Sequence, residues 1–149
     1  MSERLPWYHE NPFIQTWQVG QQHIDHYQHV NNVAYLGQQE LLAWAHSNHL
    51  GLSFSDYAEC DRGMVIRRHE LDYFLPCHLG DVIECGTWII ACDNTVSLTR
   101  QFQFVCTRRK QTVYAAKTQF ICVSVTTGAP KRMPEKFREI YGQACVGAQ

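Results

Sequence analysis

The residues best suited to chemistry stand together in one run, immediately before the longest helix-like segment of the chain. The run reads Asp25-His26-Tyr27-Gln28-His29-Val30-Asn31-Asn32. A carboxylate in such a position can act as a general base or as a nucleophile. Backbone amides at a helix N-terminus can stabilise the negative charge that develops on a carbonyl oxygen under attack. The run therefore contains both groups needed to cleave an acyl bond.

A structural interpretation of the same run stays open. Asp25 would close an Asx turn, and Asn31 or Asn32 would cap the helix. One such side chain satisfies a helix start, however, so the consecutive polar side chains from Asp25 to His29 exceed what a cap requires. The usual signatures of serine hydrolases, phosphate-binding loops, dinucleotide-binding loops and zinc proteases do not occur in the sequence.

The histidines of this region do not predict a metal site. His23, His26 and His29 are spaced by three residues, but the spacing falls in a loop, where it does not bring the side chains together. Asp25 is the one carboxylate beside them, and no Cys completes a set. Tetrahedral ligation requires converging side chains, so we predict no metal.

Hydrophobic periodicity and turn residues predict one long helix and five strands. Gly51 follows the long helix, as is typical of a helix C-terminus. The predicted elements are a strand over Phe13–Val19, the helix from Asn32 to about His49, strands over Met64–Tyr73, Val82–Cys92, Thr95–Thr107 and Gln111–Val125, and a short helix over Pro134–Tyr141.

Strict alternation in Thr95–Thr107 indicates a half-buried antiparallel strand. Its apolar side carries one exception, Arg100, for which the sequence gives no reason. The preceding strand is separated from it by Asp93-Asn94, a pair that tolerates the positive φ of a tight turn.

Consecutive strands without crossover helices exclude a doubly wound parallel sheet. The remaining class is α+β, with one curled antiparallel sheet of about five strands wrapped around one long central helix. A sheet of this kind has exposed edge strands, and a second copy of the chain pairing at an edge would cover them. We therefore predict a homodimer.

Length, charge and cysteine content narrow the function classes. The 149 residues suit a single domain, with a core over about 13–141. With 13 basic and 14 acidic residues, the chain lacks the excess positive charge of a nucleic-acid binder. It has no apolar run long enough to span a membrane, and the residues at its start are not expected to form a secretory signal. Seven cysteines without a C-x-x-C pair are expected to be reduced thiols in a cytoplasmic protein.

The run before the helix resembles the signature of hot-dog fold acyl thioesterases, the superfamily that includes 4-hydroxybenzoyl-CoA thioesterase. The form Tyr27-Gln28-His29-Val30-Asn31-Asn32 is most similar to the long-chain acyl-CoA thioesterases of bacteria and is also similar to plant acyl-ACP thioesterases. Downstream, Leu71-Asp72-Tyr73 with Pro76 and Gly80-Asp81, and then Phe120 to Val125 with Thr127-Gly128 and Pro134, resemble the family's later strands. The resemblance extends over about Phe13 to Tyr141.

The resemblance implies a single hot-dog domain over residues 1–149, a homodimer or homotetramer with active sites at the subunit interface, and hydrolysis of an acyl-CoA without metal or organic cofactor. Asp25 matches the family's catalytic aspartate, and His29 matches the histidine of the plant-type pattern, although Tyr27 stands where those enzymes have Asn. Gln28 replaces the Gly of the aromatic-acyl branch, which argues against a benzoyl-type substrate. Glu40 aligns with a common glutamate of the central helix.

We therefore expect a cytoplasmic acyl-CoA thioesterase acting on medium- to long-chain aliphatic acyl groups, with Asp25 as general base or nucleophile. The backbone amides of Val30 and Asn31 are expected to hold the oxyanion, and His29 or Asn32 to orient the thioester or the water. Tyr27 and Glu40 are expected to support the site. An acyl pocket could be lined by Leu41, Trp44, Phe102 and Phe104, or these residues could simply be core.

Three other functions stay open. The first is an acyl-ACP thioesterase, which differs only in the carrier. The second is an enoyl-thioester hydratase or dehydratase, because hot-dog proteins include such enzymes. The third is a module that binds acyl thioesters without catalysis, since a fold does not fix a function.

Overall fold

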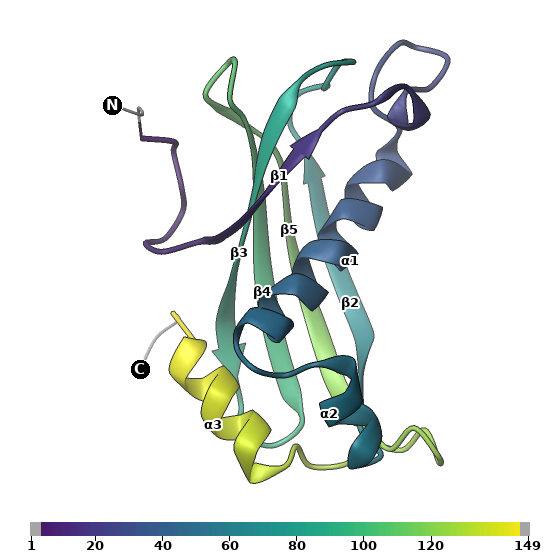
Figure 1. The fold of residues 1–149 in the computed structure, drawn as a ribbon, viewed down its shortest axis with the longest axis vertical. Coiled ribbons are helices and arrows are strands. Elements are labelled where there is room, and N and C mark those ends of the chain that lie inside the picture. Colours follow the sequence, from purple (N-terminus) through teal and green to yellow (C-terminus); the bar gives the residue numbers. More distant parts are fainter. Residues whose placement is uncertain (1–3, 147–149) are drawn as a thin grey trace. The chain divides into compact units, whose positions relative to one another are not determined.

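A computed structural model describes residues 4–146 of the chain (Figure 1). Five strands form one sheet in the order β1-β3-β4-β5-β2, and β1 pairs antiparallel with β3, with Phe13 opposite Thr87. The strands are β1 (Phe13–Gln18), β2 (Gly63–Tyr73), β3 (Val82–Cys92), β4 (Ser97–Cys106) and β5 (Gln111–Val123). The helices are the 3-10 turn η1 (Gln21–His23), α1 (Asn32–His49), α2 (Phe54–Glu59) and α3 (Glu135–Ala144). The predicted α+β class with a curled antiparallel sheet is confirmed.

The strands and the long helix lie where the sequence predicts them. The helix α1 has the predicted bounds, and Gly51 after it adopts φ +99°, a conformation that glycine adopts at no steric cost. Asn94 in the turn between β3 and β4 has φ +60°, as its residue type allows.

The helix α2 was not predicted. Its signal was present: the Ser53 hydroxyl and the Asp56 carboxylate cap each other's backbone amides in a capping box.

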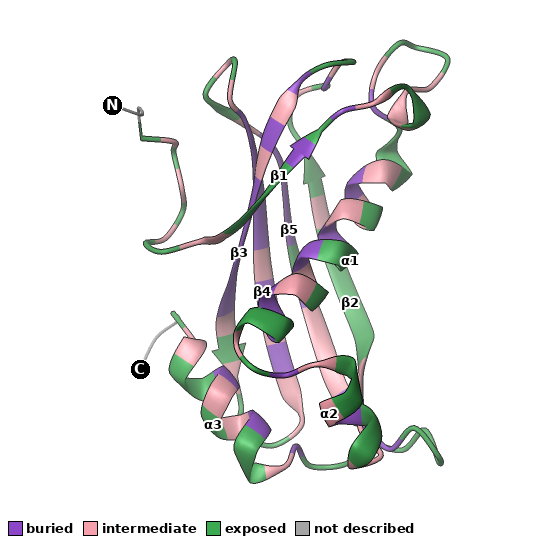
Figure 2. Ribbon diagram, viewed as in Figure 1, coloured by how far each residue is buried: buried purple, intermediate pink, exposed green. Residues whose placement is uncertain are grey.

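Two compact units divide the chain. The first unit contains the residues up to Ala43 together with Leu71–Thr87 and Phe102–Ala116, and the second contains Trp44–Glu70, Trp88–Gln101 and the residues from Lys117 onward. Each unit has its own cluster of buried apolar residues. Figure 2 shows how fully the middle strands β3 and β4 are buried in comparison with β2.

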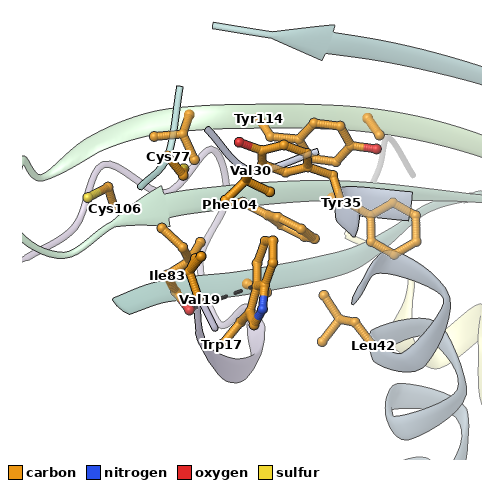
Figure 3. Close-up of a cluster of buried hydrophobic side chains, with 14 residues drawn as sticks. Trp17, Val19, Val30, Tyr35, Leu42, Cys77, Ile83, Phe104, Cys106 and Tyr114 are labelled. Carbon is orange, nitrogen blue, oxygen red and sulfur yellow. Dashed lines mark hydrogen bonds between the residues drawn. The ribbon is translucent and has the colours of Figure 1, made fainter. Parts of the chain in front are cut away.

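Aromatic rings fill the core of the first unit (Figure 3). The ring of Tyr35 from α1 stacks on Tyr114 of β5, with ring centroids 4.9 Å apart, and Phe104 of β4 packs against Tyr114 at the same distance. The Tyr114 hydroxyl donates a 2.6 Å hydrogen bond to the side-chain oxygen of Gln39, which is also buried. The polar interruption in the helix pattern is thus satisfied inside the core.

A buried cation lies in the core of the second unit. Arg100 is 2% exposed, and its guanidinium donates 2.6 Å hydrogen bonds to Nδ1 of His46 and to the Ser47 hydroxyl. The Ser47 hydroxyl bonds in turn to the hydroxyl of Tyr141 on α3 at 2.9 Å. Within residues 4–146, Arg100 pairs with no carboxylate. Arg100 therefore interrupts the apolar alternation because it ties β4 to α1 and α3 through neutral partners.

Burial, followed by the positive charge of Arg100 and the neighbouring His49, lowers the pKa of His46 to about 3. A guanidinium can only donate hydrogen bonds, so Nδ1 of His46 must act as an acceptor. The network consequently requires a neutral His46.

Candidate active site

The loop that carries Asp25 is a tight hairpin between η1 and α1. One carboxylate oxygen of Asp25 (Oδ1) accepts the Tyr27 amide at 2.9 Å, which is the predicted Asx turn. The Asp25 amide donates to the carbonyl of His29 at 2.9 Å, and Gln28 adopts φ +64° within the turn. The second carboxylate oxygen of Asp25 accepts no hydrogen bond from the residues that the structure describes. The turn thus fixes the carboxylate through one oxygen and leaves the other for a ligand.

Asn31 caps α1. Its side-chain oxygen accepts the Val33 amide at 2.8 Å, and its carbonyl accepts the Ala34 amide at 3.0 Å. The amide of Asn32, the first residue of the helix, donates to no described residue. Asn32 therefore presents an unused donor at the positive end of the helix dipole.

The two amides predicted to hold an oxyanion already have partners. The Val30 amide donates to the carbonyl of Cys77 at 2.9 Å, and the Asn31 amide donates to the carbonyl of His23 at 2.7 Å. These two hydrogen bonds fix the end of the loop to the segment after β2 and to η1. The donor available at this helix start is the amide of Asn32, one residue further along the chain.

A cleft of about 320 Å³ lies beside this loop. It brings together five of the residues singled out from the sequence: Asp25, Tyr27, His29, Val30 and Asn32. The rest of its lining is largely apolar and comes from α1 and from the end of β2 with the loop that follows: Tyr35, Tyr73, Phe74, Leu75 and Pro76. Asp25, the first residue of α1 and an apolar wall therefore line one cleft.

Other predicted site residues lie away from the cleft. Asn31 acts as the helix cap, and Glu40 is exposed on α1 outside the cleft. Of the four residues that could line an acyl pocket or belong to the core, Phe102 and Phe104 are fully buried core residues, whereas Leu41 and Trp44 are exposed on α1.

The apolar wall was not predicted, although Tyr73 and Pro76 belong to a motif that resembles the family. Tyr35 follows Asn32 by three residues, so both lie on the same face of α1. Tyr73 is brought there by the fold, and its hydroxyl donates to the Asn32 carbonyl at 3.1 Å. Burial raises the pKa of both tyrosines, so their phenols stay neutral near neutral pH.

In residues 4–146, no group of three or more His, Cys, Asp or Glu side chains is arranged to hold a metal ion. No helix in that range is both long and apolar enough to cross a membrane.

The model of the thioesterase-like superfamily matches residues 19–140 of the chain. The chain belongs to this superfamily. The match includes the loop with Asp25, α1 and all the strands except β1. No curated protein matches the sequence. Family membership supports thioester hydrolysis as the general class of activity.

Solved structures show the same hot-dog fold. A hypothetical protein from Staphylococcus aureus, solved in complex with CoA, is 17% identical and superposes with a TM-score of 0.83 over 93% of this chain and 89% of its own. A 1,4-dihydroxy-2-naphthoyl-CoA thioesterase from Synechocystis is 16% identical, with a TM-score of 0.79 over 89% and 96%. A probable thioesterase from Escherichia coli is 24% identical, with a TM-score of 0.74 over 88% and 97%.

Proposed function

We propose that this protein hydrolyses acyl-CoA thioesters to a free acid and CoA, and that its substrates carry medium- to long-chain aliphatic acyl groups. The observation that carries the proposal is the shared cleft of Asp25 and Asn32 at the start of α1. A structural neighbour that was solved with CoA bound supports CoA as the carrier. The apolar wall of the cleft, formed by Tyr35 together with residues 73–76, would hold the acyl chain.

Asp25 supplies the base or the nucleophile in this proposal. As a base, it takes a proton from water while the water oxygen attacks the thioester carbonyl, and collapse of the tetrahedral intermediate expels the CoA thiolate. As a nucleophile, its free oxygen attacks the carbonyl and expels the thiolate, and water then cleaves the resulting mixed anhydride. Both routes use the carboxylate that the Asx turn holds beside the cleft.

Asn32 supplies the oxyanion donor. Its main-chain amide is at the helix N-terminus, where the dipole favours negative charge. One such donor contributes about 2.7–4 kcal/mol to transition-state stabilisation in well-studied hydrolases. The side chains of Asn32 and His29, which line the same cleft, would orient the water or the thioester. Tyr27 lines the cleft but is 80% exposed, so it would contact the part of the substrate that extends toward solvent.

Thiol release from a panel of acyl-CoA thioesters tests the activity. We expect turnover that rises from short to medium and long aliphatic chains, with little turnover of a benzoyl-CoA. The same acyl chain on ACP compares the two carriers, and the absorbance of an enoyl-CoA reports hydration instead of hydrolysis. Binding of acyl-CoA with no thiol release from any member of the panel would contradict the proposal and favour a binding module.

We also propose that two copies of the chain pair through β2. This strand is one of the two edges of the sheet, and its residues Val65 and Ile66 are 47% and 52% exposed. In an antiparallel pair of two β2 strands, the basic Arg67 and Arg68 of one copy approach the acidic Glu70 of the other. Such pairing covers the exposed ladder and its apolar side chains together.

Ile66→Asp is expected to convert the dimer into a monomer, because it places a carboxylate in the apolar part of this edge. Sedimentation velocity measures the oligomeric state. Thiol release measures activity, which should fall together with dimerisation when the second copy completes the cleft. Leu79→Asp is the matched control, since Leu79 is 57% exposed but lies outside the strand. A wild-type protein that sediments as a monomer would contradict the pairing.

A further inference from the structure

We propose that His78 is a positioning residue that fixes the ring of His29 inside the cleft. Its connection to hydrolysis rests on the proposed function, but the contact itself can be tested without any substrate. His29 lines the cleft beside Asp25, whereas His78 lies outside the lining. The two rings meet edge to face, with centroids 5.1 Å apart and an interplanar angle of 84°.

The His29 ring depends on this contact for its orientation. Its backbone is fixed, because its carbonyl accepts the Asp25 amide at 2.9 Å. Its side chain, in contrast, forms no hydrogen bond to any residue in the range 4–146, and the ring of His78 is its aromatic neighbour. A side chain with a fixed backbone and a free ring keeps one orientation only if something packs against the ring.

His78 is held firmly enough to provide that packing. Its amide donates to Oδ2 of Asp81 at 2.9 Å, and the Asp81 amide donates back to the His78 carbonyl at 3.0 Å. Nδ1 of the His78 ring lies 3.9 Å from the same carboxylate oxygen. The backbone of His78 is thus anchored to Asp81, and its ring lies beside the same carboxylate.

Asp81 in turn is anchored to the sheet. It is 7% exposed, and Oδ1 of its carboxylate accepts Nε of Arg108 at 3.2 Å and Nη2 at 3.1 Å. Its carbonyl accepts the Val19 amide at 2.9 Å at the end of β1. A continuous series of contacts therefore leads from β1 and the turn after β4 through Asp81 and His78 to His29. All of these residues belong to the first unit.

Nuclear magnetic resonance of the histidine side chains tests the contact directly. The His29 ring signals are assigned by their loss in His29→Gln. We expect His78→Ala to shift and broaden these signals, because the ring current of His78 and the fixed orientation are both lost. His78→Phe, which retains a ring, is expected to keep them sharp. His26→Ala is the matched control, since His26 is exposed on the same loop and does not line the cleft.

Kinetics test the consequence for hydrolysis. We expect His78→Ala to lower kcat by about three- to tenfold with KM changed less than twofold, and His78→Phe to restore most of kcat, in line with the strength of one aromatic contact. His29 signals that are identical in wild type and His78→Ala would overturn the proposal. So would equal losses of kcat in His78→Ala and His78→Phe. Absence of hydrolysis in the wild type would overturn the proposed function alone, because the spectra still report on the contact.

Discussion

Replacing Asp25 by asparagine is expected to lower kcat for acyl-CoA hydrolysis by about 10²–10⁴-fold, the usual contribution of a general base. Asparagine keeps the size of the side chain, and its oxygen can still accept the Tyr27 amide that closes the turn. It cannot take a proton from water or form the mixed anhydride. The affinity for acyl-CoA should therefore stay within about threefold, since the apolar wall and the helix start are unchanged.

Steady-state thiol release and calorimetric binding of the same acyl-CoA measure the two quantities. His26→Asn is the control, because it makes a comparable change on the exposed part of the same loop. Full activity in Asp25→Asn would show that Asp25 is neither the base nor the nucleophile. Equal loss of binding and activity would indicate that the substitution disrupts the loop.

Acidification is expected to destabilise the protein strongly through His46. In the folded state its pKa is about 3, whereas an unfolded histidine titrates near 6.5. Between these values the unfolded chain binds a proton that the folded chain excludes. The free energy of unfolding therefore rises with pH across this window, is fully regained above about pH 6.5, and falls by roughly 2–4 kcal/mol as the pH approaches 3.

Urea unfolding at a series of pH values checks this prediction. His46→Asn retains a side-chain oxygen that can accept from Arg100 but does not titrate, so its unfolding free energy should depend less steeply on pH. Asp56 and Asp61, whose pKa values are lowered by hydrogen bonds, also make the unfolding free energy fall in acid, in the wild type and in His46→Asn alike. The difference between the two proteins therefore reports the contribution of His46. An unchanged slope in His46→Asn would contradict the role assigned to the network.

Much of the fold could be predicted from the sequence, because its elements have strong local signals. Alternation identifies β4, and the residues from Asn32 to Gly51 mark both ends of α1. The helix α2 has only six residues, too few for a visible periodicity, so its capping box was the one available signal. Arg100 could not be explained in advance, since its partners come from α1 and α3, two elements that are distant from β4 along the chain.

The candidate site likewise has a part that could be predicted from the sequence and a part that could not. Asp25 and its Asx turn are local, and both could be predicted from one short run of residues. The choice among neighbouring amides could not, because the partners of Val30 and Asn31 are carbonyls of Cys77 and His23, which only the folded chain brings there. The cleft wall from Tyr73 to Pro76 is likewise built by tertiary contact.

The central claim is that the thioester binds between the carboxylate of Asp25 and the amide of Asn32. A crystal structure of Asp25→Asn with a medium-chain acyl-CoA bound tests it most directly. We predict the thioester carbon beside residue 25, its oxygen within hydrogen-bond distance of the Asn32 amide, and the acyl chain against Tyr35. A thioester bound away from this loop, with the Asn32 amide directed elsewhere, would contradict the account.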